Sequence, residues 1–271
     1  MIVITGATGN VGRPLVRALA EAGERVTAVS RRISAADVPD GVRIQQADLA
    51  RPETVESALD GASALFLMVS GAFVPLDEVL GRARSSGVGR VVLLSSQGVA
   101  TGRHPTVLED SVRASGLEWT MLQPGAFASN ALQWSESVRS SRDVVAPFGD
   151  VALPVVDPDD IAAVAAAALR EAGHAGAEYV LTGPDPITPR QQAAAIGEAL
   201  GEPVRFVPQT RAEARAFMLG FMPEQVADVT LDVLGAPTPG EQRVSPDVER
   251  VLGRPPRPFT EWVSRFAAAF K

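Results

Sequence analysis

Ile2-Val-Ile-Thr-Gly6-Ala-Thr-Gly9-Asn-Val-Gly12 is the stretch of this chain that decides its fold. It consists of a short apolar strand, a glycine-rich turn and the start of a helix, with glycines spaced G-x-x-G-x-x-G. The first glycine permits a tight turn, the second lets a pyrophosphate approach the backbone, and the third allows close helix packing. The stretch predicts a dinucleotide-binding loop lined by Thr8, Asn10 and Val11, and a glycine turn without a ligand is the alternative.

Outward from this loop, β-branched apolar runs alternate with helical segments, as in βαβ units around a parallel sheet. The expected strands are Ile2–Thr5, Arg25–Ser30, Val42–Gln46, Ala64–Val69, Val91–Ser95, Trp119–Gln123 and Glu178–Thr182. The expected helices between them are Arg13–Ala22, Pro52–Leu59, Leu76–Ser86 and Leu108–Ser115. Later helices are expected to begin at Asp157, Thr188 and Thr260. We therefore predict an α/β extended Rossmann fold with a doubly wound, mainly parallel sheet.

Two regions are expected along the chain. Residues 1–150 would form the NADP-binding core, and residues 151–271, where proline and glycine become frequent, would return to the core and form a small C-terminal substrate lobe. A length of 271 residues suits one such α/β unit better than two independent catalytic domains.

Composition excludes several function classes. The net charge of −7 argues against general binding to nucleic acid or anionic membranes, because both need a basic surface. The chain has no Cys and two His, so a metal site is not expected. No leader signal and no apolar run of about 18 residues is found, so the expected compartment is the cytoplasm. A monomer or a homodimer acting on a small molecule is expected.

Ser30-Arg31-Arg32 follows the second expected strand, where NAD enzymes usually place an Asp or Glu that holds the ribose 2′-hydroxyl. A guanidinium instead grips a 2′-phosphate through charge-assisted hydrogen bonds. The position therefore favours NADP(H), with Arg31 ahead of Arg32. The alternative is two solvated surface arginines.

Two further strand ends are candidate cofactor contacts. In Ala47-Asp48-Leu49, Asp48 would accept from the adenine amino group and Leu49 would cover the ring, although Asp48 could equally cap the next helix. Met68 and Val69 end the fourth strand and would lie beside the ribose. Core packing is the alternative for Met68.

Several motifs together resemble one known family. They are Gly6-Ala-Thr-Gly-Asn-Val-Gly12, Ala47-Asp-Leu49, Ser95-Ser96, Arg113-Ala-Ser-Gly-Leu-Glu-Trp-Thr-Met-Leu-Gln-Pro-Gly125 and Val156-Asp-Pro-Asp-Asp-Ile161. With them the chain, up to about Thr188, resembles the NmrA-like atypical short-chain dehydrogenase/reductases, most of all their NAD(P)H:quinone oxidoreductase-like branch. The resemblance implies an extended Rossmann fold with a C-terminal lobe that forms the substrate cleft. The family also contains redox-sensing regulators that bind NADP without turnover, so membership alone does not establish catalysis.

Many related dehydrogenases use a Tyr-x-x-x-Lys pair for proton transfer. This chain contains one tyrosine, Tyr179, and one lysine, Lys271, which is its last residue. The pair is therefore absent, which argues against ordinary alcohol dehydrogenation.

The remaining candidates for proton transfer lie around the fifth strand. Ser95 and Ser96 end that strand, where a hydroxyl would meet a substrate carbonyl, unless both satisfy loop amides. His104 is the titratable group whose ordinary pKa suits proton transfer near neutrality, unless it is a solvated loop residue. Glu109 is interpreted as part of a capping box with Thr106 and is given no catalytic role.

Pro124 and Gly125 follow the sixth strand, and the family resemblance implies that this segment runs beside the nicotinamide. Aromatic and amide side chains beyond them would face the substrate, with interior packing as the alternative: Phe127, Asn130, Trp134 and Phe148. Asp157, Asp159 and Asp160 are interpreted as cap and dipole partners of a helix, and no metal is assigned to them.

The leading hypothesis is an NADPH-dependent oxidoreductase that transfers hydride to an activated acceptor such as a quinone or enone. Such acceptors tolerate weak acid catalysis, so the missing Tyr and Lys need not abolish turnover. A non-catalytic NADP(H) sensor and an epimerase or dehydratase with bound cofactor are the alternatives.

Overall fold

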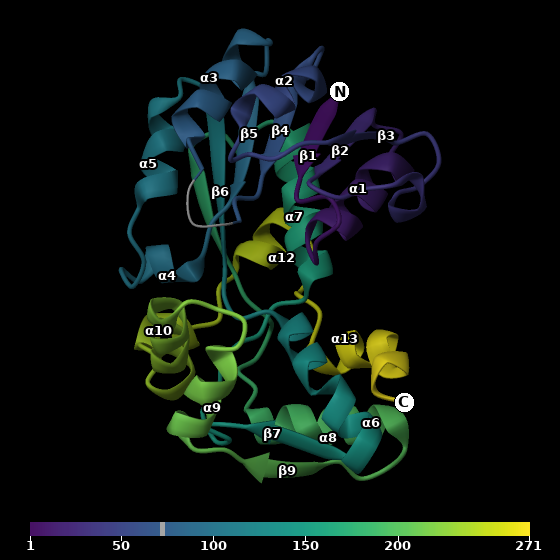
Figure 1. Cartoon of the computed structure of the whole chain (residues 1–271), viewed down its shortest axis with the longest axis vertical. Helices are drawn as coiled ribbons and strands as arrows, with labels where there is room; N and C mark the ends of the chain where they lie inside the picture. Colours follow the sequence, from purple (N-terminus) through teal and green to yellow (C-terminus); the bar gives the residue numbers. More distant parts are fainter. Residues whose placement is uncertain (71–73) are drawn as a thin grey trace.

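The computed structural model describes residues 1–70 and 74–271, which form two bodies joined by several crossings of the chain (Figure 1). The N-terminus lies at the outer end of the first body, and the C-terminus lies in the second. The long helix α7 (Pro158–Arg170) begins near the junction and packs against the sheet of the first body.

A seven-stranded parallel sheet organises the first body, in the order β3-β2-β1-β4-β5-β6-β8. Its strands are β1 (Ile2–Thr5), β2 (Val26–Ser30), β3 (Arg43–Gln46), β4 (Ala64–Leu67), β5 (Arg90–Leu94), β6 (Glu118–Pro124) and β8 (Ala177–Leu181). Chain order reverses between β1 and β4, where Ile2 pairs with Val26 on one side and with Ala64 on the other. In open α/β sheets a ligand binds at this reversal, beyond the carboxyl ends of the strands.

Helices cover both faces of this sheet because its central strands are apolar on both sides. α1 (Gly12–Glu21), α7 and α12 (Asp247–Leu252) pack on one face. The other face carries η2 (Pro52–Val55), α2 (Glu56–Leu59), α3 (Leu76–Ser85) and α5 (Val107–Ala114). The short elements η1 (Ala35–Asp37) and α4 (Gln97–Ala100) lie in connections.

The second body is built around a two-stranded parallel sheet of β7 (Asp143–Ala146) and β9 (Arg205–Pro208). Its core includes side chains from η3 (Ala128–Trp134), α6 (Ser135–Ser141), α8 (Pro189–Leu200), α13 (Phe259–Phe266) and η4 (Ala267–Phe270). A helical hairpin of α9 (Arg211–Met218) and α10 (Glu224–Gly235) has a separate small core, and α11 (Pro239–Gln242) follows it.

The predicted fold class is confirmed, and each strand expected from the sequence is present within one or two residues at either end. Asp157 and Thr188 cap α7 and α8 as expected. Thr260 is not a cap, because α13 begins one residue earlier and its capping position is Pro258. The sequence analysis missed β7, β9 and the α9–α10 hairpin.

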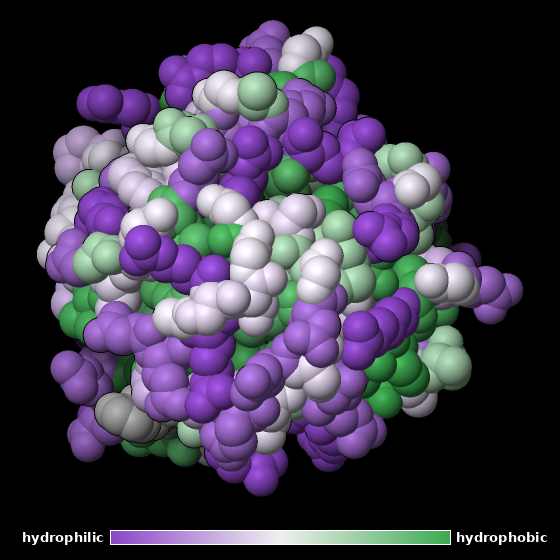
Figure 2. All heavy atoms as spheres, turned by 90° about the horizontal axis from the view of Figure 1, so that it is seen from above, coloured by the Kyte–Doolittle hydropathy of each residue, from purple (hydrophilic) through white to green (hydrophobic). Residues whose placement is uncertain are grey.

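Exposed apolar side chains are distributed unevenly. The outer end of the first body shows mainly hydrophilic side chains with small hydrophobic areas between them (Figure 2). On the second body the hairpin exposes Phe217, Leu219, Phe221 and Val226. This concentration marks the hairpin as a surface suited to apolar contact.

Candidate cofactor and substrate site

The glycine-rich loop connects β1 to α1 at the reversal of the sheet. Gly6 has a φ of +64°, a left-handed conformation that glycine adopts without strain. A Cβ on Gly12 would lie 2.1 Å from the carbonyl oxygen of Gly6, so only glycine permits this approach. The first turn of α1 contains no acidic residue, which leaves its positive dipole end uncompensated for an anion.

Two side chains of the loop hold it in place. Thr8 Oγ1 lies 3.1 Å from Ser30 Oγ at the end of β2. Asn10 donates from Nδ2 to Ser129 Oγ of η3 at 3.2 Å, which connects the first body to the second. Val11 is buried at the start of α1.

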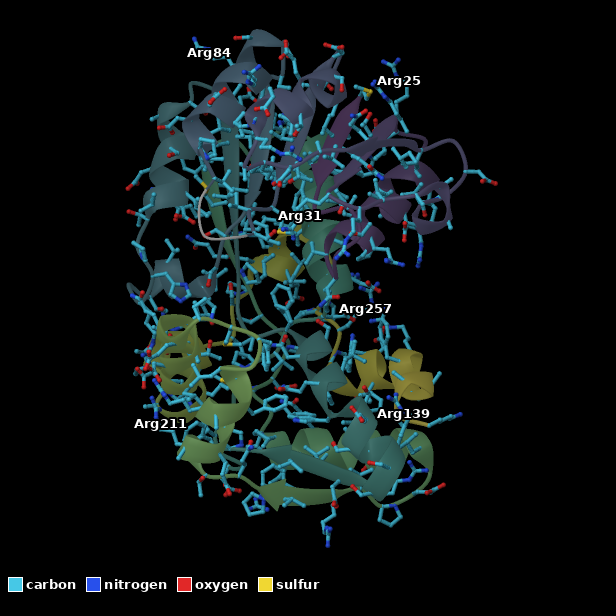
Figure 3. All side chains as sticks on the ribbon, viewed as in Figure 1. Arg25, Arg31, Arg84, Arg139, Arg211 and Arg257 are labelled. Carbon is cyan, nitrogen blue, oxygen red and sulfur yellow. The ribbon has the colours of Figure 1, made fainter. Side chains whose placement is uncertain are left out.

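Arg31 and Arg32 follow β2 as exposed side chains, and neither forms an ion pair within residues 1–70 and 74–271. Arg31 lies on the side of the first body that faces the second (Figure 3). The nearby Arg13 is engaged, since its guanidinium lies 3.9 Å from the Asp37 carboxylate. The two guanidinium groups after β2 are therefore available to an anionic ligand.

At the ends of β3 and β4 the candidate contacts are already partly engaged. Asp48 Oδ1 accepts from the Ala50 backbone N–H at 3.1 Å, as in a local turn. Leu49 and Val69 are partly buried against the sheet core. Met68 covers the glycine loop, because a Cβ on Gly6 would lie 2.3 Å from the Met68 methyl carbon.

The carboxyl end of β5 holds the most informative polar contact. Ser95 is half-buried, and its hydroxyl donates to Glu109 Oε1 of α5. Glu109 is 2% exposed, and its other oxygen, Oε2, is buried without a hydrogen-bond partner in the described part of the chain. The neighbouring Ser96 has a structural role, since its hydroxyl accepts from Gly98 N at the start of α4.

The capping-box interpretation of Glu109 is therefore wrong. Thr106 makes no side-chain cap, and its hydroxyl donates to Asp110 at 2.7 Å. Asp110 points outward to meet Thr106, and the adjacent Glu109 points inward toward the end of β5.

His104 is half-buried in the loop after α4, and its backbone N–H donates to the Gly98 carbonyl at 2.9 Å. The imidazole covers Gly98, where a Cβ would lie 2.5 Å from Nδ1. Its side chain forms no hydrogen bond with Ser95 within the described residues. The structure thus brings together Ser95 and Glu109, rather than Ser95 and His104.

Arg103, beside His104, joins the two bodies. Its Nε donates at 2.5 Å to Glu241 of α11, a carboxylate that is 2% exposed. Burial alone would raise the pKa of Glu241, but the hydrogen bonds from Arg103 and from the Thr238 backbone hold the pKa below its ordinary value. Gln97 contributes a further contact, from Nε2 to the Gly240 carbonyl at 3.3 Å.

The segment after β6 leads from the sheet into the second body. Gly125 N donates to the Leu181 carbonyl at 2.9 Å, and a Cβ there would lie 3.0 Å from Gln97 Oε1. Pro124 is the last residue of β6, and Phe127 forms a bridge with Val156. The backbone here is fixed by its neighbours on both sides.

A cavity of about 840 Å³ opens from this segment into the second body. Three of the four predicted substrate residues line it, namely Phe127, Asn130 and Trp134. Phe148 does not belong to the lining; its ring lies against Gly235 of α10 and packs on the hairpin core. Further lining comes from the hairpin: Ala214, Phe217, Met218, Phe221, Met222, Thr230 and Leu234.

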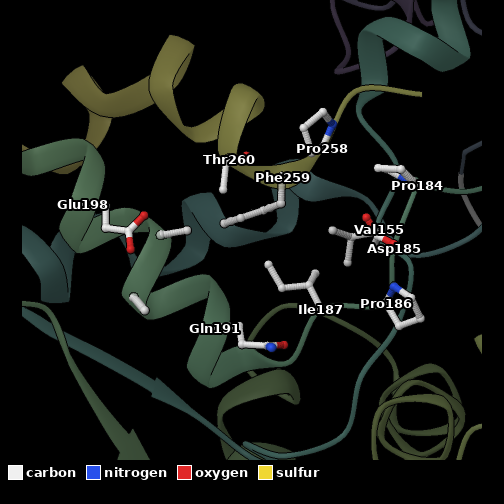
Figure 4. Close-up of a pocket in the computed structure, with 12 residues that line it drawn as sticks. Val155, Pro184, Asp185, Pro186, Ile187, Gln191, Glu198, Pro258, Phe259 and Thr260 are labelled. Carbon is white, nitrogen blue, oxygen red and sulfur yellow. The ribbon is translucent and has the colours of Figure 1, made fainter. Parts of the chain in front are cut away.

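A second cavity, of about 450 Å³, lies between α8, α13 and the segment after β8 (Figure 4). Its wall shares Val155 and Ile187 with the larger cavity. None of its lining residues comes from the loops after β1, β4, β5 or β6, so it is separate from the edge where a cofactor would bind.

The one tyrosine of the chain, which has no lysine four residues after it, makes a structural contact. Tyr179 lies in β8, where its hydroxyl is 2.8 Å from His174 Nδ1, and burial raises the pKa of its phenol. No group of three metal-ligating side chains occurs in the residues that the structure describes. None of the described helices combines the length and the apolarity needed to cross a membrane.

The glycine loop, its place at the sheet reversal and the uncompensated helix end define a Rossmann-type dinucleotide-binding protein. Residues 6–172 match the model of a protein family described as NAD(P)H-binding. The chain belongs to this family, and its resemblance to the NmrA-like atypical reductases is confirmed.

Full-length relatives agree with this placement. The chain is 38% identical over 280 residues to (4-alkanoyl-5-oxo-2,5-dihydrofuran-3-yl)methyl phosphate reductase of Streptomyces griseus, covering 100% of this chain and 99% of the relative. It is 35% identical over 286 residues to NAD(P)H azoreductase of Xenophilus azovorans, with coverage of 100% and 99%. The crystal structure of the NADPH-dependent quinone oxidoreductase QOR2 of Escherichia coli, complexed with NADPH, superposes with a TM-score of 0.81 at 27% identity, covering 98% of this chain and 99% of that one.

The sequence analysis missed two parts of this region. Glu109 was given a capping role because a Thr three residues before a Glu fits the capping box, and only the contact of Thr106 with Asp110 shows otherwise. The cavity residue Phe217 lies at the end of α9 and Phe221 in the connection to α10, and neither belongs to a motif. Their apolar character beside charged neighbours was the available signal.

Proposed function

We propose that this protein is an NADPH-dependent reductase that transfers a hydride to an uncharged, conjugated acceptor held in the 840 Å³ cavity. One observation carries the proposal: Ser129 lines the cavity and also accepts from Asn10 of the glycine loop. The phosphate-binding loop and the cavity wall are therefore in direct contact. The same proposal includes a cofactor core built mainly from residues 1–150, to which α7, β8 and α12 return, and a substrate lobe built mainly from residues 151–271, to which η3, α6 and β7 are added.

The residues present fit a dinucleotide. The tight approach of Gly12 to Gly6 and the open N-terminus of α1 would receive the pyrophosphate. Arg31, with Arg32 beside it, would bind the 2′-phosphate. Contacts to the adenosine and nicotinamide halves would come from Thr8, Asp48, Leu49, Met68, Val69, Ser95, Pro124, Gly125 and Phe127. When bound, the nicotinamide supplies the hydride.

The cavity favours an uncharged acceptor. Its wall contains Phe127, Trp134, Phe217 and Phe221, and its one charged lining residue within the described chain is Glu136. No arginine or lysine lines it, so a phosphate on the acceptor would be desolvated without a counter-ion. Although the Streptomyces griseus relative is named for a phosphate ester, we propose a quinone or enone without a charged group here.

Cofactor preference tests the first half of the proposal. Arg31→Ala should lower NADPH affinity about 10- to 100-fold and leave NADH affinity nearly unchanged, because one charge-assisted contact contributes about 1.5–3 kcal/mol. Calorimetric titration of both dinucleotides measures this effect. Arg17→Ala on α1 is the matched control, and equal wild-type affinity for NADPH and NADH would contradict the assignment.

The acceptor is tested by following NADPH oxidation with a neutral quinone, a neutral enone, a phosphorylated enone and an aliphatic ketone. We expect rapid turnover of the first two and little of the others, because unactivated ketones need a positioned acid worth about 10²–10⁴-fold. Tight NADPH binding with no turnover of any acceptor would instead support a sensor. We further expect a cytoplasmic protein that acts as a monomer or homodimer.

A further inference from the structure

We propose that Glu109 holds the proton that Ser95 delivers to the reduced acceptor, so that the two residues form a relay at the carboxyl end of β5. This inference rests on the proposed function and adds a proton source to it. It rests on the contact between the Ser95 hydroxyl and Glu109 Oε1 and on the burial of the carboxyl group behind that contact.

The hydrogen-bonding of Glu109 is incomplete in a way that a structural role does not explain. Its Oε2 is buried and has no partner in the described chain, although a buried unsatisfied polar atom costs about 1–3 kcal/mol. Buried groups left unsatisfied in this way often have a functional role. A carboxyl group that served only the dipole of α5 could stay in water, as the neighbouring Asp110 does.

The relay is placed where the acceptor must react. In the sheet, β5 lies between β4 and β6, and the register that pairs Leu94 with Leu122 places Ser95 level with Gln123, near the end of β6. Ser95 N donates to the Leu122 carbonyl at 2.7 Å, which fixes its backbone against β6. The cavity begins one residue beyond Gly125, at Ala126. Ser95 does not itself line the cavity; its half-buried hydroxyl lies at the carboxyl end of β5, where an acceptor that extended beyond the Ala126 end of the cavity would meet it.

Three arginines near α5 pair with carboxylates other than Glu109. Arg113 pairs with Asp110 and with Glu178. Arg103 pairs with Glu241, on the other side of the loop. On the packed helix α3, Arg82 pairs with Glu56 and Glu78. Within the described residues, Ser95 is the one hydrogen-bond partner of Glu109.

The proton transfer needs no reactant other than the two side chains and solvent. Conjugate addition of the hydride to an enone leaves an enolate, which takes the proton of Ser95 Oγ–H. For this step Glu109 carries a proton on Oε1, so the contact between the two oxygens is reversed: the carboxylic O–H donates to Ser95 Oγ, and the Ser95 hydroxyl donates to the acceptor. As the Ser95 O–H bond breaks, the carboxylic O–H of Glu109 breaks too, and its proton moves to Ser95 Oγ. Glu109 is left as a carboxylate and Ser95 as a hydroxyl, and solvent returns one proton to Glu109 before the next turnover. The electron pair of the hydride is the only one transferred.

Acceptors that differ in their demand for a proton test the relay. An enolate is strongly basic, and a hydroquinone anion is less so. A cationic triphenylmethane dye, whose delocalised charge Glu136 of the cavity wall would balance, becomes neutral on accepting hydride and needs no proton. Glu109→Gln keeps the shape of the side chain but holds no transferable proton. It should lower kcat about 100-fold with the enone, about 10-fold with the quinone and less than twofold with the dye, with KM nearly unchanged.

Three variants complete the experiment. Ser95→Ala should reproduce the gradient across the acceptors, while Asp110→Asn, on the same helix and exposed, should leave every rate within about twofold. Equal losses with all three acceptors in Glu109→Gln would show a structural role and overturn the relay. If His104→Gln showed this gradient while Glu109→Gln kept the wild-type rates, the proton would be assigned to His104 instead.

A measurement without turnover separates this inference from the proposed function. Infrared spectra of the NADPH-bound protein should contain a carboxylic acid C=O stretch that Glu109→Gln removes and Asp110→Asn retains. Absence of that difference would overturn the inference even if the protein proves an active reductase. A wild-type protein that reduces none of the acceptors would refute the proposed function instead, whatever the spectrum shows.

Discussion

The sheet body and the α9–α10 hairpin differ most in the depth of their apolar cores. The sheet is covered on both faces, and Ile4, Phe66 and Leu93 are fully buried within it. The hairpin core contains Ala214, Met218, Ala227 and Leu231, while Phe217 and Phe221 are 56% and 63% exposed. A dinucleotide presents the same pyrophosphate group at every turnover, which suits a rigid loop, whereas a wall that would receive apolar acceptors is better left with apolar surface of its own.

If buried ion pairs hold the sheet body together, removing one of them should have the largest effect on the free energy of unfolding. Asp160, on α7, is fully buried and binds Arg254 and Arg257 at 2.7 and 2.6 Å. Asp160→Ala should lower the free energy of unfolding by about 3–5 kcal/mol, because it leaves two guanidinium groups without their buried partner. Urea unfolding measures this change.

Asp159→Ala is the control for that substitution. Asp159 is 35% exposed in its side chain and pairs with Arg265 at the surface, so its loss should cost about 0–1 kcal/mol. Equal losses in the two variants would mean that burial of the ion pair does not matter here.

The rigid cradle itself is tested at Gly12. Gly12→Ala should weaken NADPH binding about 100-fold or more, which corresponds to roughly 2.7 kcal/mol, because its Cβ would overlap the Gly6 carbonyl. Calorimetric titration gives the affinity. Gly81→Ala in α3, where a Cβ meets nothing within 4 Å, should leave binding unchanged, and unimpaired affinity in Gly12→Ala would refute the loop geometry.

Weakening the ion pair of Arg103 with Glu241, which connects the two bodies, should have an intermediate effect on stability. This effect should depend on pH. Glu241→Gln should cost about 1.5–3 kcal/mol at neutral pH, since it weakens a charged hydrogen bond to Arg103. Because the folded-state pKa of Glu241 is lowered, this contribution is complete above the ordinary value of 4.5 and is lost as the pH falls below it. Chemical unfolding of both proteins at several pH values should show their difference shrinking in acid, and a constant difference would contradict the assignment.

The smallest effect on stability is expected in the hairpin. Phe217→Ala should change the free energy of unfolding by less than about 0.5 kcal/mol, because the ring is mostly exposed. It should nevertheless raise KM for an apolar acceptor about fivefold through lost contact area. Phe266→Ala, an exposed phenylalanine of α13 outside the cavity, is the control, and an equal rise of KM in both variants would show that Phe217 does not contact the acceptor.

The sheet could be predicted from the sequence because its signals are local. Strands such as Ala64–Leu67 are apolar throughout, and a strand buried on both faces needs no partner-specific pattern to be recognised. The β7–β9 pair was missed because it joins two short segments far apart in the chain. Its strand β9 also carries the charged Arg205 and ends at Pro208, which weakens the strand pattern.

The candidate site was predictable where function depends on backbone shape. Glycine is needed at positions 6 and 12 for steric reasons. The glycine spacing that reflects this need can be read from a single sequence. The orientation of Glu109 was not predictable, because two adjacent acidic residues compete for Thr106 and the outcome depends on the packing of α5. The cavity wall depends on tertiary contacts between η3, α8 and the hairpin, for which no local pattern exists.

The parallel pairing of β7 with β9 has a consequence for biosynthesis. A ribosome releases β7 well before it has made α7, β8 and α8, so this strand waits for its partner β9 while the rest of the chain emerges. During that interval Val144 and Val145 offer an unpaired apolar edge, which is the kind of surface that invites association with other nascent chains. Slow translation between these strands should therefore favour insoluble product, and a chaperone that shields extended segments should improve the yield.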